Sequence, residues 1–248
     1  MKVNNFERIK GYYEKVDVVS DYMKKRFTKP IYFVEHKLQV ELVNQALKEY
    51  NPKKVLEIAP GPARLTTELC IDEGIALDHS PEMLKLAERR IKQVDKNWKF
   101  IRGDAFHLPF RKSSFDFLLT FRFIRHFEKP DRIKLYQEFK RLLKNNGILV
   151  FEAINHKKAA LIRRMVGIEK YKIYDKLYTE EELLGELEKN GFDVLKLEGV
   201  INHFFIEMIV SKISSFIGLN NFGKRIIMLL ERTKGRNPLG WVVICRKK

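Results

Sequence analysis

The sequence contains little cysteine and no long apolar run. Two cysteines, Cys70 and Cys245, stand among 248 residues, too few for a disulfide framework or a thiolate metal cluster. No uncharged apolar stretch reaches the roughly 20 residues of a membrane-spanning helix, and the opening MKVNNFERIK lacks the apolar core of a secretion signal. We therefore expect a cytoplasmic protein without a metal cofactor, with both thiols buried in apolar elements.

Glycine is also scarce where a nucleotide-binding turn usually needs it. Residues 53–69, KKVLEIAPGPARLTTEL, predict a buried strand, a turn and the start of a helix, but only Gly61 lies in the turn. A dinucleotide-binding turn carries three glycines so that the backbone can approach the pyrophosphate. Glu57, at the end of the strand, would repel a pyrophosphate placed over the turn. A nicotinamide oxidoreductase is therefore the least favoured interpretation.

The charge balance, by contrast, is strongly basic. The chain has 48 Lys and Arg against 32 Asp and Glu, a formal net charge of +16. Such a field attracts anions, but it does not distinguish nucleic acid, anionic lipid and acidic small molecules.

Apolar strands alternate with helical patterns over residues 53–200, and residues 241–247 predict one more strand. This alternation predicts an α/β fold with a doubly wound, seven-stranded, mostly parallel Rossmann-like sheet. We find no internal repeat or linker and expect a single domain. Its predicted parts are N-terminal helices (1–50), a core (51–200), a helical insertion (201–236) and the last strand (237–248).

Particular residues predict where the helices begin and end. Ser80 and Thr179 have the side chains that cap helix N-termini. Gly74 and Gly147 are expected to end helices over residues 64–74 and 130–147.

Two acidic residues lie at the ends of the first two predicted strands. An acid at the end of the second strand, here Asp78, is the expected receptor for ribose hydroxyls. An acid at the end of the first strand, here Glu57, suits a cationic ligand. A nucleoside with an ammonium group and a positive sulfur meets both conditions, and S-adenosylmethionine is such a ligand.

Six segments, taken in chain order, resemble the motifs of the class I S-adenosylmethionine-dependent methyltransferases. They are VLEIAPGPA, IALDHSPEMLKLA, FIRGDAFHLPF, SFDFLLTFRFIRHF, LLKNNGILVFEA and YTEEELLGELEKNGFDV. The resemblance covers roughly residues 50–200 and is greatest to the small-molecule and quinone-type branch (methyltransferase type 11-like). It implies a Rossmann-like cofactor-binding core, S-adenosylmethionine as cofactor and S-adenosylhomocysteine as product.

The resemblance also assigns residues to each part of the cofactor. These are Glu57, Ala59, Pro60 and Gly61 at its amino-acid end, Asp78, His79 and Met83 along the ribose, Asp104, Ala105 and Phe106 at the adenine, and Thr120, Phe121 and Arg122 at the methyl-donor end.

The first motif departs from the family pattern, because Ala59 and Ala63 stand where glycine is usual. Alanine resists positive φ, and the prolines at 60 and 62 fix φ and remove amide donors. We therefore expect a stiffer turn with fewer donors.

His126 is the candidate catalytic residue, because many relatives carry a histidine near the reaction centre at this point. A histidine can act as a general base near neutral pH. Methyl transfer from a sulfonium depends mainly on in-line positioning, so a site without a base is also open. The resemblance further makes YYEKVDVVSDYMKKRF a lid, with Tyr12, Tyr13 and Arg26 as contacts.

The predicted insertion is basic and amphipathic. Residues 201–248 hold nine Lys and Arg against two acids, and apolar residues recur at helical spacing: Phe205, Met208, Ile209, Ile213, Phe216 and Ile217. Such a helix lies on an anionic membrane, covers an apolar pocket or caps the sheet edge as core.

We predict methyl transfer to a small or lipophilic acceptor by in-line displacement. Two alternatives remain. One is an RNA methyltransferase guided by the basic surface, disfavoured because TFRF replaces the Asn/Asp-Pro-Pro-aromatic motif of base-amine methylation. The other is a non-catalytic, cofactor-binding scaffold protein.

Overall fold

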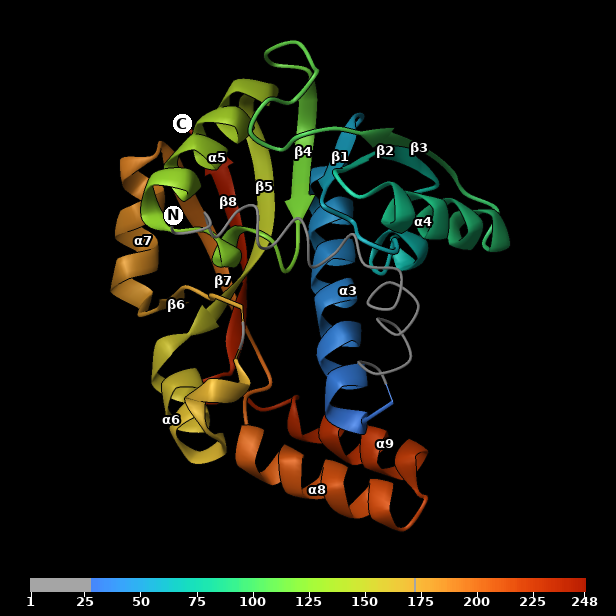
Figure 1. The fold of residues 1–248 in the computed structure, drawn as a ribbon, viewed down its shortest axis with the longest axis vertical. Helices are drawn as coiled ribbons and strands as arrows, with labels where there is room; N and C mark the ends of the chain where they lie inside the picture. Colours follow the sequence, from blue (N-terminus) through green and yellow to red (C-terminus); the bar gives the residue numbers. More distant parts are fainter. Residues whose placement is uncertain (1–27, 172) are drawn as a thin grey trace.

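A twisted eight-stranded sheet forms the centre of the molecule (Figure 1). The computed structural model describes residues 28–171 and 173–248. The strands are β1 (Val55–Ile58), β2 (Glu73–Asp78), β3 (Asn97–Arg102), β4 (Phe115–Thr120), β5 (Leu143–Asn155), β6 (Leu177–Tyr178), β7 (Phe192–Val200) and β8 (Gly240–Lys247). Their order is β3-β2-β1-β4-β5-β8-β7, with β6 paired to β5 beside this path.

Parallel pairing joins β3, β2, β1, β4 and β5, whereas β8 is antiparallel to both β5 and β7. The predicted doubly wound, mostly parallel sheet is therefore confirmed, with the two-residue β6 as an addition. Since the chain order reverses between β1 and β4, the carboxyl ends of these two strands flank the position where such folds bind ligands.

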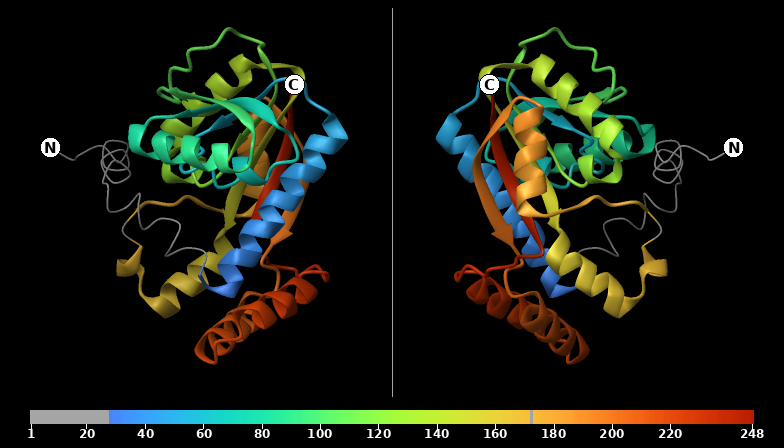
Figure 2. Two further views of the ribbon diagram at one scale, coloured as in Figure 1. Left: turned by 90° about the vertical axis from the view of Figure 1, so that its right-hand side faces the viewer. Right: turned by 90° about the vertical axis from the view of Figure 1, so that its left-hand side faces the viewer.

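Helices cover both faces of the sheet, because the parallel strands are apolar on both sides. One core joins the strands to α5 (Lys129–Leu142) and α7 (Glu180–Lys189). The other joins them to α3 (Pro30–Tyr50) and α4 (Pro81–Gln93). The remaining helices, α6 (His156–Val166), α8 (Phe204–Phe216) and α9 (Asn220–Leu230), gather at one end of the molecule (Figures 1 and 2).

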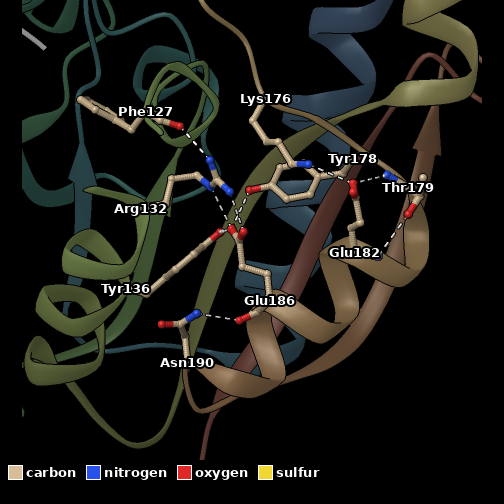
Figure 3. A network of polar contacts seen from close by, with 9 residues as sticks. All are labelled: Phe127, Arg132, Tyr136, Lys176, Tyr178, Thr179, Glu182, Glu186 and Asn190. Atoms are coloured by element: carbon tan, nitrogen blue, oxygen red, sulfur yellow. Dashed lines mark hydrogen bonds and ion pairs between the residues drawn. The ribbon is translucent and has the colours of Figure 1, made fainter. Parts of the chain in front are cut away.

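A buried polar network ties α7 to α5 and β6 (Figure 3). Arg132 donates from Nε and Nη2 to the two carboxylate oxygens of Glu186, at 2.9 and 2.6 Å. The hydroxyls of Tyr178 and Tyr136 also donate to Glu186, at 2.7 and 3.2 Å. A buried carboxylate with this many donors stays ionised and fixes the helix that carries it.

Both predicted helix caps are present. The Ser80 hydroxyl accepts a hydrogen bond from the Met83 amide at 3.2 Å. Thr179 forms a reciprocal capping box with Glu182 at the start of α7. Short-range sequence signals therefore set these two helix starts.

The predicted helix over residues 64–74 is wrong. Only Thr66–Glu68 form a single 3₁₀ turn, and Gly74 lies inside β2. Thr66 donates to Glu57 at 2.5 Å, and Thr67 donates back to the Ala63 carbonyl at 3.1 Å. Such side-chain bonds compete with helix formation. Cys70, expected to be buried, is consequently exposed, whereas Cys245 is buried as expected.

The predicted end of the helix over 130–147 is also wrong. The α5 helix ends at Leu142, and residues from Leu143 onward belong to β5, where Leu143 pairs with Phe115 of β4. Strand pairing with β4 overrides the helical pattern of this segment, and Gly147 lies within the strand.

The proposed lid contacts Tyr12, Tyr13 and Arg26 lie outside the described residues. Among the residues that are described, no helix is long and apolar enough to cross a membrane.

Candidate active site

A pocket opens at the carboxyl ends of β1, β2, β3 and β4, where the fold is expected to bind a ligand. All but two of the residues predicted for the cofactor line it: Glu57, Ala59, Pro60, Gly61, Asp78, His79, Met83, Asp104, Ala105, Phe121 and Arg122. The candidate base, His126, lines it as well. Lining residues that were not predicted are Arg64, Leu65, Leu77, Ser80, Gly103, Phe123 and Phe127.

In the turn after β1, every second residue has a left-handed backbone conformation. Ala59, Gly61 and Ala63 all have left-handed φ angles, +55°, +56° and +55°, and the two prolines lie between them. The expectation that alanine would avoid positive φ is therefore wrong. Backbone hydrogen bonds hold the strained shape: the Ala59 amide donates to the Leu77 carbonyl at 2.8 Å, and the Ala63 amide to the Pro60 carbonyl at 3.2 Å. At Gly61 a side chain would enter open space, so the glycine leaves room for a ligand to approach the backbone.

Glu57 lies buried beneath this turn. Its carboxylate accepts the Thr66 hydroxyl at 2.5 Å. Burial raises the pKa of Glu57 to about 7, and the Thr66 bond and the nearby Arg64 charge offset only part of this effect. A cationic group of a ligand placed beside it would favour the ionised form.

Asp78 links the ends of the first two strands. One carboxylate oxygen accepts the Gly61 amide at 2.9 Å, and the other accepts the Ser80 amide at 2.9 Å. Burial raises the pKa of Asp78, although these two amides stabilise its charged form. Because a carboxylate offers about four acceptor positions, these bonds leave capacity for a pair of hydroxyl groups.

At the far end of the pocket, Asp104 accepts the Phe106 amide at 3.0 Å and closes a tight turn. Phe106 is not among the lining residues. It packs edge-on against Phe127, with ring centroids 5.3 Å apart, and Phe127 lines the pocket in its place. Thr120 is likewise buried at the end of β4 and is not a lining residue.

Two arginines give the turn end of the pocket a positive charge. Arg64 is buried and donates to the Gln39 side chain at 3.0 Å. It also donates to Nδ1 of His36 at 2.6 Å, which leaves the other ring nitrogen to donate to Glu68 at 2.7 Å. Arg122 lies 3.6 Å from Glu35. The prediction missed Arg64, although it is the only cation within the turn that follows β1.

His126 is held by Asp175, a residue that the sequence did not point to. Its Nδ1 lies 3.0 Å from both the Asp175 carboxylate and the Tyr174 carbonyl. Arg125 and Arg163 contact the same carboxylate at 3.1 and 2.7 Å. Burial opposes ionisation, but the His126 bond and the arginine charges outweigh it and lower the pKa of Asp175 to about 2.

The pocket fits S-adenosylmethionine in its donor and acceptor set. It has acids for an ammonium group and a ribose diol, cations for a carboxylate, and apolar walls from Leu77, Met83 and Phe127. Over residues 28–171 and 173–248, no cluster of three or more His, Cys, Asp and Glu side chains is arranged to hold a metal ion.

Comparison with known proteins agrees with this geometry. Residues 55–147 match the model of a methyltransferase domain family. The chain is 39% identical over 112 residues to a demethylmenaquinone methyltransferase of Thermotoga maritima, covering 44% of this chain and 46% of that protein. It is 30% identical over 161 residues to the demethylmenaquinone methyltransferase of Lactococcus lactis, covering 62% and 61%. These matches span less than two thirds of the relatives' own length.

Among solved structures, magnesium protoporphyrin IX methyltransferase from Synechocystis, with S-adenosylhomocysteine bound, superposes with a TM-score of 0.65 at 11% identity. The superposition covers 99% of this chain and 100% of that one. Strand order and family match together define a methyltransferase domain. The family match, the relatives and the fold together support a class I S-adenosylmethionine-dependent methyltransferase family for this chain.

Proposed function

We propose that the protein transfers a methyl group from S-adenosylmethionine to a small lipophilic acceptor of the quinone type. The observation that carries this proposal is that Glu57, Gly61 and Asp78 line one pocket, in which Asp78 accepts a hydrogen bond from the Gly61 amide. The relatives named demethylmenaquinone methyltransferases support the acceptor class.

In this proposal each acidic residue recognises one polar part of the cofactor. Asp78 accepts the ribose diol, Glu57 accepts the ammonium group, and Asp104 accepts the exocyclic amine of the adenine. Arg64 and Arg122 balance the carboxylate. His79, Met83 and Ala105 line the ribose and adenine, with Phe127 packing on the side where Phe106 was expected.

When bound, the cofactor supplies an activated methyl group, whose bond to sulfur breaks with the electron pair staying on sulfur. Phe121, Phe123 and Phe127 line the pocket together with Arg122, and the rings of Phe123 and Phe127 pack edge-on with centroids 5.0 Å apart. An aromatic lining suits a flat aromatic acceptor. An acceptor that attacks with a ring carbon or a hydroxyl must lose a proton. His126 takes that proton at Nε2, and Asp175 holds the ring through Nδ1.

Calorimetric titration with S-adenosylhomocysteine tests the cofactor site. We expect Asp78→Asn to weaken binding about 10- to 100-fold, since it removes a charged acceptor of two hydroxyls. Asp193→Asn, a matched change at an exposed aspartate of β7, should leave binding unchanged. Equal affinity in the wild type and Asp78→Asn would refute the assigned site.

Turnover tests the reaction. Transfer of labelled methyl from S-adenosylmethionine to the hydroquinone form of demethylmenaquinone, with a shortened side chain for solubility, is the expected result. Product binding without turnover on this acceptor and on RNA would instead support a scaffold protein. Turnover on RNA alone would support the nucleic-acid alternative.

A further inference from the structure

The α8 helix is packed with its apolar side outward. Its buried positions are Phe204, Glu207, Ser211 and Ser214, of which three are polar. Its apolar residues are exposed instead: Phe205, Ile206, Ile209, Ile213, Phe216 and Ile217. With about 100° per residue, this exposed set spans an arc of about 120°, opposite the buried positions.

The polar side faces inward because the neighbouring helices approach it closely. The Ser211 hydroxyl accepts the Ile31 amide at the start of α3, at 3.3 Å. A side chain at Gly223 of α9 would come within 2.1 Å of the Ser214 hydroxyl. Small residues are therefore needed on this side, and the apolar arc has no room to turn inward.

Exposed apolar side chains continue from α8 through the connecting turn into the first turn of α9. We call Phe205, Ile206, Ile209, Ile213, Phe216, Ile217, Leu219 and Phe222 the hairpin face. Phe216 is 92% exposed, and the others from Ile206 to Phe222 are each more than half exposed. So many exposed large apolar residues mark an interaction surface.

The exposed charges within residues 204–236 are all positive, and one of them, Lys234, is paired with Glu198 of β7 at 3.2 Å. Between residues 204 and 236 the exposed charged residues are Lys212, Arg225, Arg232, Lys234 and Arg236. The two acids of this segment are turned inward: Glu207 is buried, and Glu231 accepts the amides of Ile201 and Asn202. From α6, Lys158 lies over the Phe205 ring, 5.0 Å from its centroid.

We propose that the hairpin face lies on the surface of an anionic lipid membrane. An apolar arc bordered by cations complements acyl chains bordered by anionic headgroups. A second copy of this chain is a weaker fit, because a symmetric contact would bring two cationic borders together.

The position of this surface suits a lipophilic acceptor. The β4 arrow in Figure 1 points toward the end of the molecule that carries α8 and α9, and the pocket opens at the carboxyl end of β4. The purpose of the contact rests on the proposed function, since it would present the pocket to acceptors dissolved in the bilayer. The contact itself requires no methyl transfer.

Vesicle flotation with the full chain tests the contact. We expect binding to vesicles of equal parts phosphatidylglycerol and phosphatidylcholine, and little binding to phosphatidylcholine alone. Binding should weaken in about 1 M salt, where the screening length is about 3 Å. The double variant Ile213→Ser with Phe216→Ser should bind at least about 10-fold more weakly, and Lys212→Gln with Arg225→Gln about 10- to 30-fold more weakly. Leu184→Ser, at an exposed leucine of α7, is the matched control and should bind like the wild type.

The substituted side chains are exposed, so each variant should fold and titrate with S-adenosylhomocysteine like the wild type. That titration separates failure of the membrane contact from failure of the cofactor site. The proposal is overturned if the wild type does not float, or if it floats equally with the serine double variant. A dimer in solution that Phe216→Ser converts to monomer would assign the face to a second copy instead.

Discussion

At the scale of single residues, the contact between Asp175 and His126 decides which ring nitrogen can act as a base. The two atoms beside Nδ1, a carboxylate and a carbonyl oxygen, only accept hydrogen bonds. Nδ1 therefore carries the proton, and Nε2 holds the lone pair in the neutral ring. Asp175 is in this sense a positioning residue, and His126 is the group that would contact the acceptor.

We expect Asp175→Asn to lower kcat for the hydroquinone acceptor about 10- to 100-fold with little change in S-adenosylhomocysteine affinity, because the amide can hold the wrong tautomer. His126→Gln should lower kcat at least as much and should also leave the affinity for S-adenosylhomocysteine nearly unchanged. Steady-state kinetics with the hydroquinone acceptor and a calorimetric titration of each variant check this. An unchanged kcat in His126→Gln would contradict a base role, whereas a parallel loss of product binding would indicate a purely structural one.

Site residues could be predicted from the sequence where their position at the end of a strand determines where they lie. Asp78 and Glu57 end adjacent strands, so their meeting followed from the fold. Asp175 lies in the segment between α6 and β6, and only tertiary packing brings it to His126, nearly 50 residues earlier in the chain. Arg64 was missed for a different reason: the segment was interpreted as helix, which hid its closeness to the pocket.

At the scale of elements, the turn after β1 stores strain in two alanines. A left-handed alanine costs roughly 1–2 kcal/mol, whereas replacing a regular alanine by glycine costs about 0.5–1 kcal/mol. We expect Ala59→Gly to raise the free energy of unfolding by up to about 1 kcal/mol, measured by urea denaturation.

Two comparisons make this prediction specific. Ala63→Gly should be near neutral, because it also removes a fully buried methyl group. Ala160→Gly, in the interior of α6, should destabilise by about 1 kcal/mol. If Ala59→Gly destabilises as much as Ala160→Gly does, the left-handed conformation of Ala59 is not strained in solution.

The start of a helix could be predicted where a side chain caps an amide three residues away, as at Ser80 and Thr179. The predicted boundaries were wrong where a residue distant in sequence offers a competing hydrogen bond or strand pairing. Thr66 and Thr67 form bonds that replace a helix after β1, and Leu143 joins β4 instead of continuing α5. Five of the six apolar residues predicted for one face of α8 lie in its exposed arc, whereas Met208 packs against the core. The outward direction of this face depends on α3 and α9 and could not be inferred from spacing.

At the scale of the whole molecule, carboxyl groups with shifted pKa values fall into two sets with opposite effects on stability. Asp175 and Glu68 have pKa values lowered to about 2, so the stability they contribute is lost as pH falls through about 2. Glu57 has a pKa raised to about 7. Burial, together with the adjacent Glu231, raises the pKa of Glu207 to about 9. The folded state keeps these two protons after the unfolded chain has released them, so both groups lower stability as pH rises above about 4.5.

We therefore expect the cofactor-free protein to unfold with a larger free energy at pH 5 than at pH 8.5, measured by urea denaturation at both pH values. Glu207→Gln mimics the protonated side chain without titrating. It should raise the free energy of unfolding by at least about 1 kcal/mol at pH 8.5 and change it little at pH 5. Glu231→Gln is the contrasting variant, because Glu231 accepts the Ile201 and Asn202 amides and should destabilise at both pH values. If Glu207→Gln and the wild type lose the same stability between pH 5 and pH 8.5, Glu207 does not hold its proton in the folded protein. The Glu207 and Glu231 carboxyl groups are then both ionised.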